Sequence, residues 1–293
     1  MGHQTTAMYG LNRGEVSELA LGRVDIERLR LSAEVQENWL PRTLGPMMLR
    51  PGTSYIAETY NSSACVGVPF IFGASDTAIL EFTDSLLRIF VNEAPIERVS
   101  VATTVPAFAS WASSASTGAT VTLGATLDIS GNLAGLQSTV TGTLTIAGGD
   151  QAKEHALRIV VERGPIKFRV GTASGLSDIF KTSTLDEGTH SLAFTPNTGT
   201  VYVQFESSEY ALRRVSSVSM EAAGVLTLPS PYAAADLDDV RYETSGDTMF
   251  LTGGGAQQQR IERRGTRSYS IVLYKSPDGP FPAFPGDASV LMT

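Results

Sequence analysis

The stretch TAILEFTDSLLRIFVN, Thr77–Asn92, decides the fold class of this chain. It holds two apolar runs with the turn-forming pair Asp84-Ser85 between them. Short runs of β-branched and aromatic residues on either side of two turn residues predict a β-hairpin. Similar runs precede and follow it, so we expect an antiparallel meander. The four runs are Val66–Phe72, Thr77–Thr83, Leu86–Asn92 and Arg98–Val105.

The composition changes at Trp111, and from there to Gly149 the only charged residue is Asp128. A Ser-, Thr-, Gly- and Ala-rich stretch could be a low-complexity linker. Apolar residues alternate with polar ones over Val121–Ile129 and Val140–Ile146, however, which favours strands. Clearer strand patterns follow at Ala156–Arg163, Ile166–Gly171, Ile179–Leu185, Thr189–Thr195, Val201–Glu206 and Arg213–Glu221. This range predicts a compact jelly-roll-like β-sandwich.

A second meander follows the sandwich. Its strand patterns are Val240–Thr244, Thr248–Thr252, Gln257–Arg263 and Arg267–Tyr274. Regular hairpins of this kind are typical of a propeller blade or a barrel wall. We therefore expect a mainly β protein, in which an antiparallel meander forms a propeller- or barrel-like body. A short N-terminal helix and an inserted jelly-roll-like β-sandwich complete the expected fold.

The expected domain organisation is a discontinuous body around the inserted sandwich. A flexible N-terminus covers residues 1–10, the arm and first part of the body 11–108, the sandwich 111–221, and the second part of the body 223–281. The remaining residues, 282–293, form a tail that begins a new strand pattern. We therefore expect the natural chain to continue past Thr293.

The N-terminal region predicts a short helix and then an extended arm. Apolar residues from Ile26 to Trp39 fall near helical spacing, and Asp25 is a candidate N-cap. Pro41 ends the pattern, and further prolines and glycines up to Gly52 keep the backbone extended or turning. An arm of this kind is suited to holding a neighbouring subunit rather than to building an active site.

The bulk composition limits the classes of function. The net charge of −8 and the pI of about 5.0 argue against a protein that grips nucleic acid, which needs Lys and Arg against the phosphates. Charged residues make up only 18%, which is typical of a sheet-rich chain or one with large subunit interfaces. The single cysteine, Cys65, excludes an intrachain disulfide and predicts a buried free thiol. No signal peptide or membrane span is evident, so we expect synthesis in a cytoplasm.

The histidines carry little sign of catalysis. They are His3, His155 and His190. His190 could act with Asp186 and a serine, but the nucleophile-elbow pattern is missing, which favours surface histidines on the rim of the sandwich. We expect no enzymatic activity, no cofactor and no metal.

Three other features have simpler explanations than a binding site. The carboxylate pairs Glu15/Glu18 and Glu34/Glu37 fit solvated helix faces. The carboxylates between Asp236 and Asp239 lack the EF-hand pattern and fit a helix N-terminus. The glycines of Gly253–Gly255 lack the following Gly-Lys-Ser/Thr of a phosphate loop, which favours a hairpin turn with positive φ.

The densest basic cluster is Arg260, Arg263, Arg264 and Arg267. On a strand Arg260, Glu262 and Arg264 share one face and Arg263 lies on the other. The cluster could contact DNA phosphates or form ion pairs between subunits. Because Glu262 neutralises part of it, a salt-bridged outer face is the favoured interpretation.

Aromatic residues of the sandwich could form a sugar-stacking platform. Phe168 and Phe205 alternate with polar neighbours and are expected in the core. Trp111, Tyr202 and Tyr210 remain as candidates for a glycan platform.

Several blocks of the sequence resemble one family of virion proteins. The blocks are Gly14-Glu15-Val16-Ser17, Leu21-Gly22-Arg23-Val24-Asp25, Asn38-Trp39-Leu40-Pro41 and Arg50-Pro51-Gly52-Thr53-Ser54-Tyr55. The meander over 68–92 and the segments PSPYAAADLDDVRYETSGDTMFLTG and QQRIERRGTRSYSI also look like that family. Together the blocks resemble the tail nozzle (tail tubular protein B-like) proteins of short-tailed phages. They cover about the first hundred and last seventy residues, and the sandwich lies outside the pattern.

The resemblance implies a ring, commonly six-fold, below the portal and adaptor of a phage tail, through which DNA passes without sequence-specific binding. It implies a virion protein made in the host cytoplasm, with copies of itself, the adaptor and portal-side proteins and possible tail fibres as partners. The expected subunit or adaptor interface comprises Arg23, Asp25, Trp39, Pro41, Arg50, Pro51 and Tyr55. The alternative is an adhesion or fibre-docking protein whose sandwich binds a host glycan or another tail protein.

Overall fold

A computed structural model describes residues 10–20, 22–23, 25–73 and 76–275 of the chain. The chain divides into two compact units between Ile56 and Ala57. Both hydrophobic cores found among the described residues belong to the second unit. Within the same residues, no helix has the length and apolar character needed to cross a membrane.

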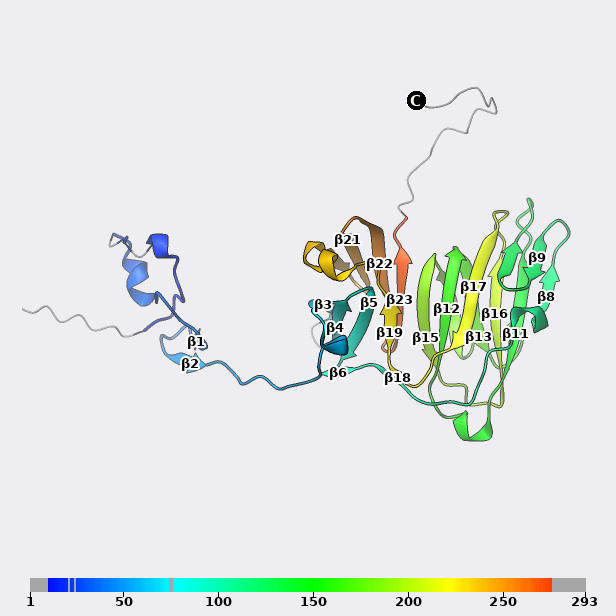
Figure 1. Cartoon of the computed structure of the whole chain (residues 1–293), viewed down its shortest axis with the longest axis horizontal. Helices are drawn as coiled ribbons and strands as arrows, with labels where there is room; N and C mark the ends of the chain where they lie inside the picture. The colour runs from blue at the N-terminus through cyan, green and yellow to red at the C-terminus, as the bar shows by residue number, and fades with distance from the viewer. Residues whose placement is uncertain (1–9, 21, 24, 74–75, 276–293) are drawn as a thin grey trace, which may run out of the picture. The chain divides into compact units, whose positions relative to one another are not determined.

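The first unit contains short 3-10 helices and a two-stranded sheet (Figure 1). The helices are η1 (Glu18–Ala20) and η2 (Glu27–Leu31), and the strands are β1 (Trp39–Pro41) and β2 (Met47–Leu49). The two strands pair antiparallel, with Trp39 opposite Leu49 and Pro41 opposite Met47. Between them lies Gly45, whose φ of 103° strongly favours glycine.

The helix predicted over Ile26–Trp39 is wrong in its extent. It shortens to η2, which ends at Leu31; Ala33 then forms an isolated bridge with Glu15, and Trp39 begins β1. A helix this short is marginal unless an apolar face packs against something. Neither η1 nor η2 has a buried residue, which explains why the helical pattern does not extend.

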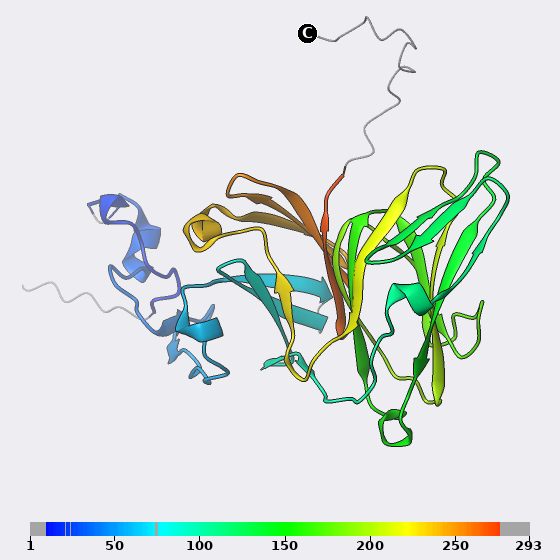
Figure 2. The same ribbon diagram turned by 45° about the vertical axis from the view of Figure 1, so that its right-hand side comes forward.

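The second unit is built around a nine-stranded antiparallel sheet (Figures 1 and 2). Its strands, in spatial order, are β20 (Arg241–Ser245), β21 (Thr248–Gly253), β22 (Ala256–Gly265), β23 (Ser268–Leu273), β15 (Gly188–Phe194), β12 (His155–Arg163), β17 (Arg213–Met220), β10 (Leu127–Ser130) and β9 (Thr120–Leu123). The pairing of β23 with β15 joins the second meander and the sandwich region in one sheet. The domain boundaries predicted at 111–221 and 223–281 stay predictions, because one continuous sheet runs through both ranges.

Two five-stranded sheets pack against the long sheet. One has the order β14 (Phe180–Leu185), β13 (Ile166–Gly171), β16 (Thr200–Ser207), β11 (Ser138–Thr145) and β8 (Ala112–Ala115). The other comprises β19 (Thr227–Pro229), β5 (Leu86–Val91), β4 (Asp76–Thr83) and β3 (Val66–Gly73), with β6 (Ala94–Pro95) beside β5. A small pair links β7 (Glu97–Arg98) with β18 (Gly224–Val225). The 3-10 helices of this unit are η3 (Tyr60–Ser62), η4 (Phe108–Ser110), η5 (Gly148–Asp150) and η6 (Ala234–Asp239).

The two cores lie on opposite faces of the nine-stranded sheet. His190 of β15 pairs with Ser270 of β23, so the neighbouring Ile271 points to the other face. Leu192 shares the face of His190 and belongs to the first core, which the sheet β14–β8 covers. Ile271 belongs to the second core, which the sheet β19–β3 covers. Each end of the long sheet is therefore covered on one face and uncovered on the other.

The first core depends on one close approach between backbone and ring. Trp111 stacks on Phe205 with the ring centroids 6.1 Å apart and meets Phe108 edge-on. A Cβ at Gly142 would lie only 2.5 Å from the Trp111 ring, so this strand position of β11 requires glycine. The indole N–H donates to the Pro106 carbonyl, which satisfies its one polar group.

Most predicted strands are confirmed. The hairpin of 77–92 forms from β4 and β5 with Ser85 at φ 57°, and the low-charge stretch after Trp111 forms strands β8 to β11. The turn predicted at Gly253–Gly255 has φ of 115°, 58° and 67°. Every sheet of the described residues is open, so they close no barrel. The tail 282–293 lies outside the described residues.

Two local predictions are wrong. The strand predicted over Arg98–Val105 shortens to β7. The residues after Arg98 form hydrogen bonds with side chains and not with the backbone of a neighbouring strand. The Ala102 N–H donates to Asp150 at 2.8 Å, and the Thr103 hydroxyl meets His155 at 2.9 Å. Cys65, predicted to be buried, is exposed, since the chain enters the sheet only at Val66.

Candidate functional site

The residues predicted at a subunit interface all lie in the first unit, and all are exposed. They are Arg23, Asp25, Trp39, Pro41, Arg50, Pro51 and Tyr55. The structure brings Trp39 and Pro41 together on β1, opposite β2. Arg50, Pro51 and Tyr55 follow in an extended segment without regular secondary structure. Their exposure makes them available to a partner and does not by itself identify one.

Apolar exposure is concentrated in the first unit. Half of the eighteen large apolar side chains exposed among the described residues belong to residues 10–56. Leu44 is 93% exposed, and Tyr55 is 76% exposed. The only buried residue described in that range is Gly45. This concentration of exposed apolar side chains makes the first unit a candidate surface for another molecule to cover.

Two exposed contacts order the predicted interface locally. Arg23 forms a bidentate pair with Asp25 at 2.7 and 2.8 Å, and this contact lowers the pKa of the Asp25 carboxyl. Because the carboxylate is engaged there, Asp25 does not cap η2, and Ile26 occupies the cap position. Arg50 donates to the Asn38 side chain at 2.6 Å, beside an Asn38 backbone with φ of 62°. Exposed pairs of this kind contribute little to stability.

The basic cluster is paired within the chain. Arg260 forms ion pairs of 2.5 Å with Asp186 and with Glu262, and Glu262 also pairs with Arg264. This confirms that Arg260, Glu262 and Arg264 share one face of β22. Arg264 also donates to the Ser270 hydroxyl at 3.1 Å.

The other two arginines of the cluster also have intrachain partners. Arg263 pairs with Asp76 at 2.6 Å and with Asp247 at 3.1 Å, and it lies 4.1 Å from the centroid of the Phe72 ring. Arg267 pairs with Glu154 at 2.6 Å and donates to the Glu97 carbonyl. Each guanidinium is thus neutralised locally, which argues against the cluster as a set of phosphate contacts. The pairs hold hairpins and loops of the second unit together.

A buried cluster around Arg98 was not predicted from the sequence. Arg98 pairs with Glu221 at 2.7 Å and with Glu154 at 3.0 Å, and it donates to the Ser191 hydroxyl at 2.7 Å. Glu221 also accepts from Arg158 at 2.6 Å. The Arg98 and Glu221 side chains are almost fully buried. Arg98 and Glu221 are 123 positions apart in the sequence, so no local motif could reveal the cluster.

The three candidates for a glycan platform do not form one surface. Trp111 is buried in the first core, which corrects its proposed role as a stacking platform. Tyr202 is half-buried on β16, and Tyr210 is exposed in the loop before β17. Phe168 and Phe205 are core residues, as predicted.

His155 and His190 are buried, not on a surface rim as predicted. His190 lies 2.8 Å from the Ser270 hydroxyl and 2.9 Å from the Asp186 carbonyl oxygen, so Nε2–H donates to the carbonyl and Nδ1 accepts from the hydroxyl. Burial lowers the pKa of His190 to about 3, which keeps the ring neutral. The Asp186 carboxylate pairs instead with Arg260. His190 therefore contacts Ser270 and the Asp186 backbone but not the Asp186 carboxylate, so the three side chains do not form a triad.

The acidic residues offer no ready metal site. Within the part of the chain that the structure describes, no three His, Cys, Asp or Glu side chains gather as metal ligands do. Asp236 begins the acidic run in η6, where the described chain forms a 3-10 turn rather than an α-helix.

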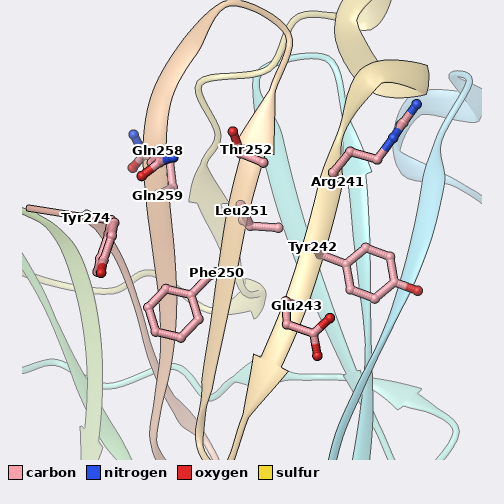
Figure 3. Close-up of a pocket in the computed structure, with 9 residues that line it drawn as sticks. All are labelled: Arg241, Tyr242, Glu243, Phe250, Leu251, Thr252, Gln258, Gln259 and Tyr274. Carbon is pink, nitrogen blue, oxygen red and sulfur yellow. The ribbon is translucent and has the colours of Figure 1, made fainter. Parts of the chain in front are cut away.

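An open groove of about 490 Å³ lies on the outer face of the second meander (Figure 3). The rings of Phe250 and Tyr274 form its apolar part, 5.2 Å apart and nearly perpendicular. Glu243, Thr252 and Gln258 supply polar groups around them. Sequence reasoning missed this site, although Phe250 alternates with the core residues Met249 and Leu251 and must therefore face away from the core.

Comparison with known proteins finds no match to this chain among protein-family models, curated proteins or solved structures.

Proposed function

We propose that this chain is a structural subunit of a nozzle-like phage tail ring, placed below the portal and adaptor, that forms a conduit for genome ejection. The resemblance of the blocks around Gly14–Asp25, Asn38–Pro41 and Arg50–Tyr55 to tail nozzle proteins motivates the proposal. The observation that carries it is the first unit, which exposes its apolar side chains and has almost no buried residues.

The first unit has the properties of an assembly arm. After η1 and η2 it contains a hairpin, β1 and β2, and then the extended segment up to Ile56. If a partner covered the exposed side chains of Leu44, Leu49 and Tyr55 fully, burial of each would stabilise the complex by roughly 1.5–3 kcal/mol. In a ring, each subunit offers one surface to the next and a different one to the previous, and an arm with exposed apolar side chains suits this head-to-tail contact.

The long sheet supplies a second reason to expect neighbours. It ends in two different edge strands, β20 and β9, and both are short. Open edges are liabilities that proteins shorten, cover or pair with another chain. Closure into a ring, with six-fold symmetry as in the family it resembles, would cover such edges.

The charge of the chain supports passage of DNA rather than capture. Its net charge is −8, and its densest arginine cluster is neutralised by intrachain carboxylates. A lumen rich in free arginine would hold DNA through many phosphate contacts. The proposal therefore includes no sequence-specific DNA binding and no catalysis, and it places the chain in the virion tail after synthesis in the host cytoplasm.

The proposal also includes the fold of the inserted sandwich, which we take to be a jelly roll. Its support is the strand order: β10-β17-β12-β15 in the long sheet faces β11-β16-β13-β14 in the other. These are the two four-stranded sheets that a jelly roll of eight consecutive strands, β10 to β17, would form.

A second candidate function is adhesion or fibre docking by this sandwich. One observation favours it: two neighbouring loops expose Leu133 and Tyr210, and the Gly131 N–H joins the loops by donating to the Glu209 carbonyl. Glycan-array binding that is lost with Tyr210→Ala, and kept with Trp39→Ala as control, would support adhesion. If no glycan on the array bound the chain, only the proposal of a ring subunit would remain.

Negative-stain imaging of the purified full chain tests the ring. The proposal predicts closed rings with a central channel wide enough for duplex DNA. Particles that stay the size of one subunit at high protein concentration, or that grow into open filaments, would contradict it.

A further inference from the structure

The uncovered faces at the two ends of the nine-stranded sheet differ in chemistry. On the face opposite the first core, β12 and β17 present Arg158, Ser217 and Ser219, which suit contact with water. On the face opposite the second core lie the partly exposed rings of Phe250, on β21, and Tyr274, the residue after β23. Aromatic rings on an otherwise uncovered sheet face mark a binding surface.

The groove combines flat rings with hydrogen-bonding groups at close range. Phe250 and Tyr274 meet edge to face, and the side chains of Gln258, Thr252 and Glu243 surround them (Figure 3). Proline-rich segments bind grooves of this composition, because their rings pack on aromatic faces while their carbonyls accept hydrogen bonds from nearby amides and hydroxyls. Its volume of about 490 Å³ fits a short peptide segment.

A proline-rich segment follows the last residue of this groove in the sequence. Tyr274 lines the groove, and the described residues end one position later at Lys275, which pairs with Glu187 at 2.5 Å. The sequence then continues for eighteen residues as SPDGPFPAFPGDASVLMT. We propose that residues 280–285 of this tail, PFPAFP, bind in the groove of Phe250 and Tyr274 on the same molecule.

Length and concentration favour this occupant over a separate peptide. Residues 275–280 can span up to about 20 Å when extended, which is enough to turn back onto the neighbouring strands. A short tether gives an effective concentration in the millimolar range, so even a weak site would be filled. Prolines at 280, 282 and 285 also reduce the entropy lost on binding, since their φ is already fixed. The inference stands independently of the proposed tail ring.

Photo-crosslinking of the full chain tests it. Phe284→p-benzoylphenylalanine places a crosslinker in the tail, and peptide mass spectrometry locates the bond. The expected product is a crosslink within one chain to residues 241–259. Phe250→Ala should weaken the binding of the tail about five-fold, as the loss of one aromatic contact predicts, and should therefore lower the crosslink yield. Tyr210→Ala, an exposed tyrosine outside the groove, should leave the yield unchanged.

A variant of the tail controls for the possibility that Phe250→Ala lowers the yield by disturbing the sheet. Pro280→Ser, Pro282→Ser and Pro285→Ser together change only residues beyond the described sheet, and they should lower the yield as Phe250→Ala does. Crosslinks at any other surface, crosslinks only between chains, or a yield that survives both variants would overturn the proposal.

Discussion

The two units of this chain use apolar residues in opposite ways. The second unit buries aromatic and aliphatic side chains in two cores, one on each face of a nine-stranded sheet. The first unit has comparable residues, such as Trp39, Leu44 and Tyr55, and leaves them exposed. A chain does not gain stability from apolar groups that stay in water. This difference is our reason for proposing that a partner covers the first unit, whereas the second unit already buries two cores of its own.

The largest expected contrast lies between two aromatic substitutions. Phe205→Ala removes a fully buried ring from the first core and should lower the free energy of unfolding by about 4 kcal/mol. Trp39→Ala in the first unit should change it by less than about 0.5 kcal/mol. Urea denaturation followed by circular dichroism measures both. A loss from Trp39→Ala as large as that from Phe205→Ala would erase the distinction between the units.

A second contrast compares two ion pairs. Arg98→Ala leaves the buried carboxylate of Glu221 with only Arg158 as a charged partner, which should cost about 3 kcal/mol. Arg23→Ala breaks an exposed pair with Asp25 and should leave the denaturation midpoint unchanged. If both substitutions proved neutral, the buried cluster would not be holding the second unit together.

The second unit should also lose stability in acid through one histidine. The folded pKa of His190 is about 3, below its ordinary value near 6.5, so the unfolded state binds the extra proton. The stabilisation is therefore complete above about pH 7 and is lost as the pH falls. Between pH 7 and 5 the loss should be about 2 kcal/mol. His190→Gln should flatten this part of the pH profile, and an unchanged slope would show that other groups cause it.

The smallest effect should appear in assembly rather than in folding. Tyr55→Ala removes one exposed aromatic ring from the first unit and should weaken self-association about ten-fold while leaving the unfolding midpoint unchanged. Sedimentation velocity over a dilution series measures the first quantity. Tyr210→Ala, which lies outside the first unit, is the matched control, and equal effects from both tyrosines would remove the special role of the arm.

Strands were the part of the fold that local sequence could predict. Alternation over Val121–Ile129 and the two-residue turn at Ser85 depend only on neighbouring residues, and both predictions are confirmed. The helix over Ile26–Trp39 was wrong because helical spacing also needs an apolar face that packs, and the first unit has none. The strand after Arg98 failed because distant side chains satisfy its backbone.

The candidate sites depended more strongly on long-range pairing. The residues predicted at an interface are exposed, in a segment whose prolines and glycines the sequence already shows. The pairing of Arg260 with the nearby Glu262 followed from the local pattern, whereas the further partners Asp186 of Arg260 and Asp76 of Arg263, 74 and 187 positions away, did not. The burial of Trp111 was not predicted, because the ring stacks on Phe205 and needs the space left by Gly142, and both residues lie in other strands.

Sedimentation equilibrium on two forms of the protein shows whether the first unit drives self-assembly. The full chain and a form lacking residues 1–56 are compared over the same concentration range, with circular dichroism to verify that both are folded. We expect the full chain to assemble into a closed oligomer and the shortened form, which keeps both cores, to be a folded monomer. A full chain that stays monomeric, or a shortened form that assembles equally well, would contradict it.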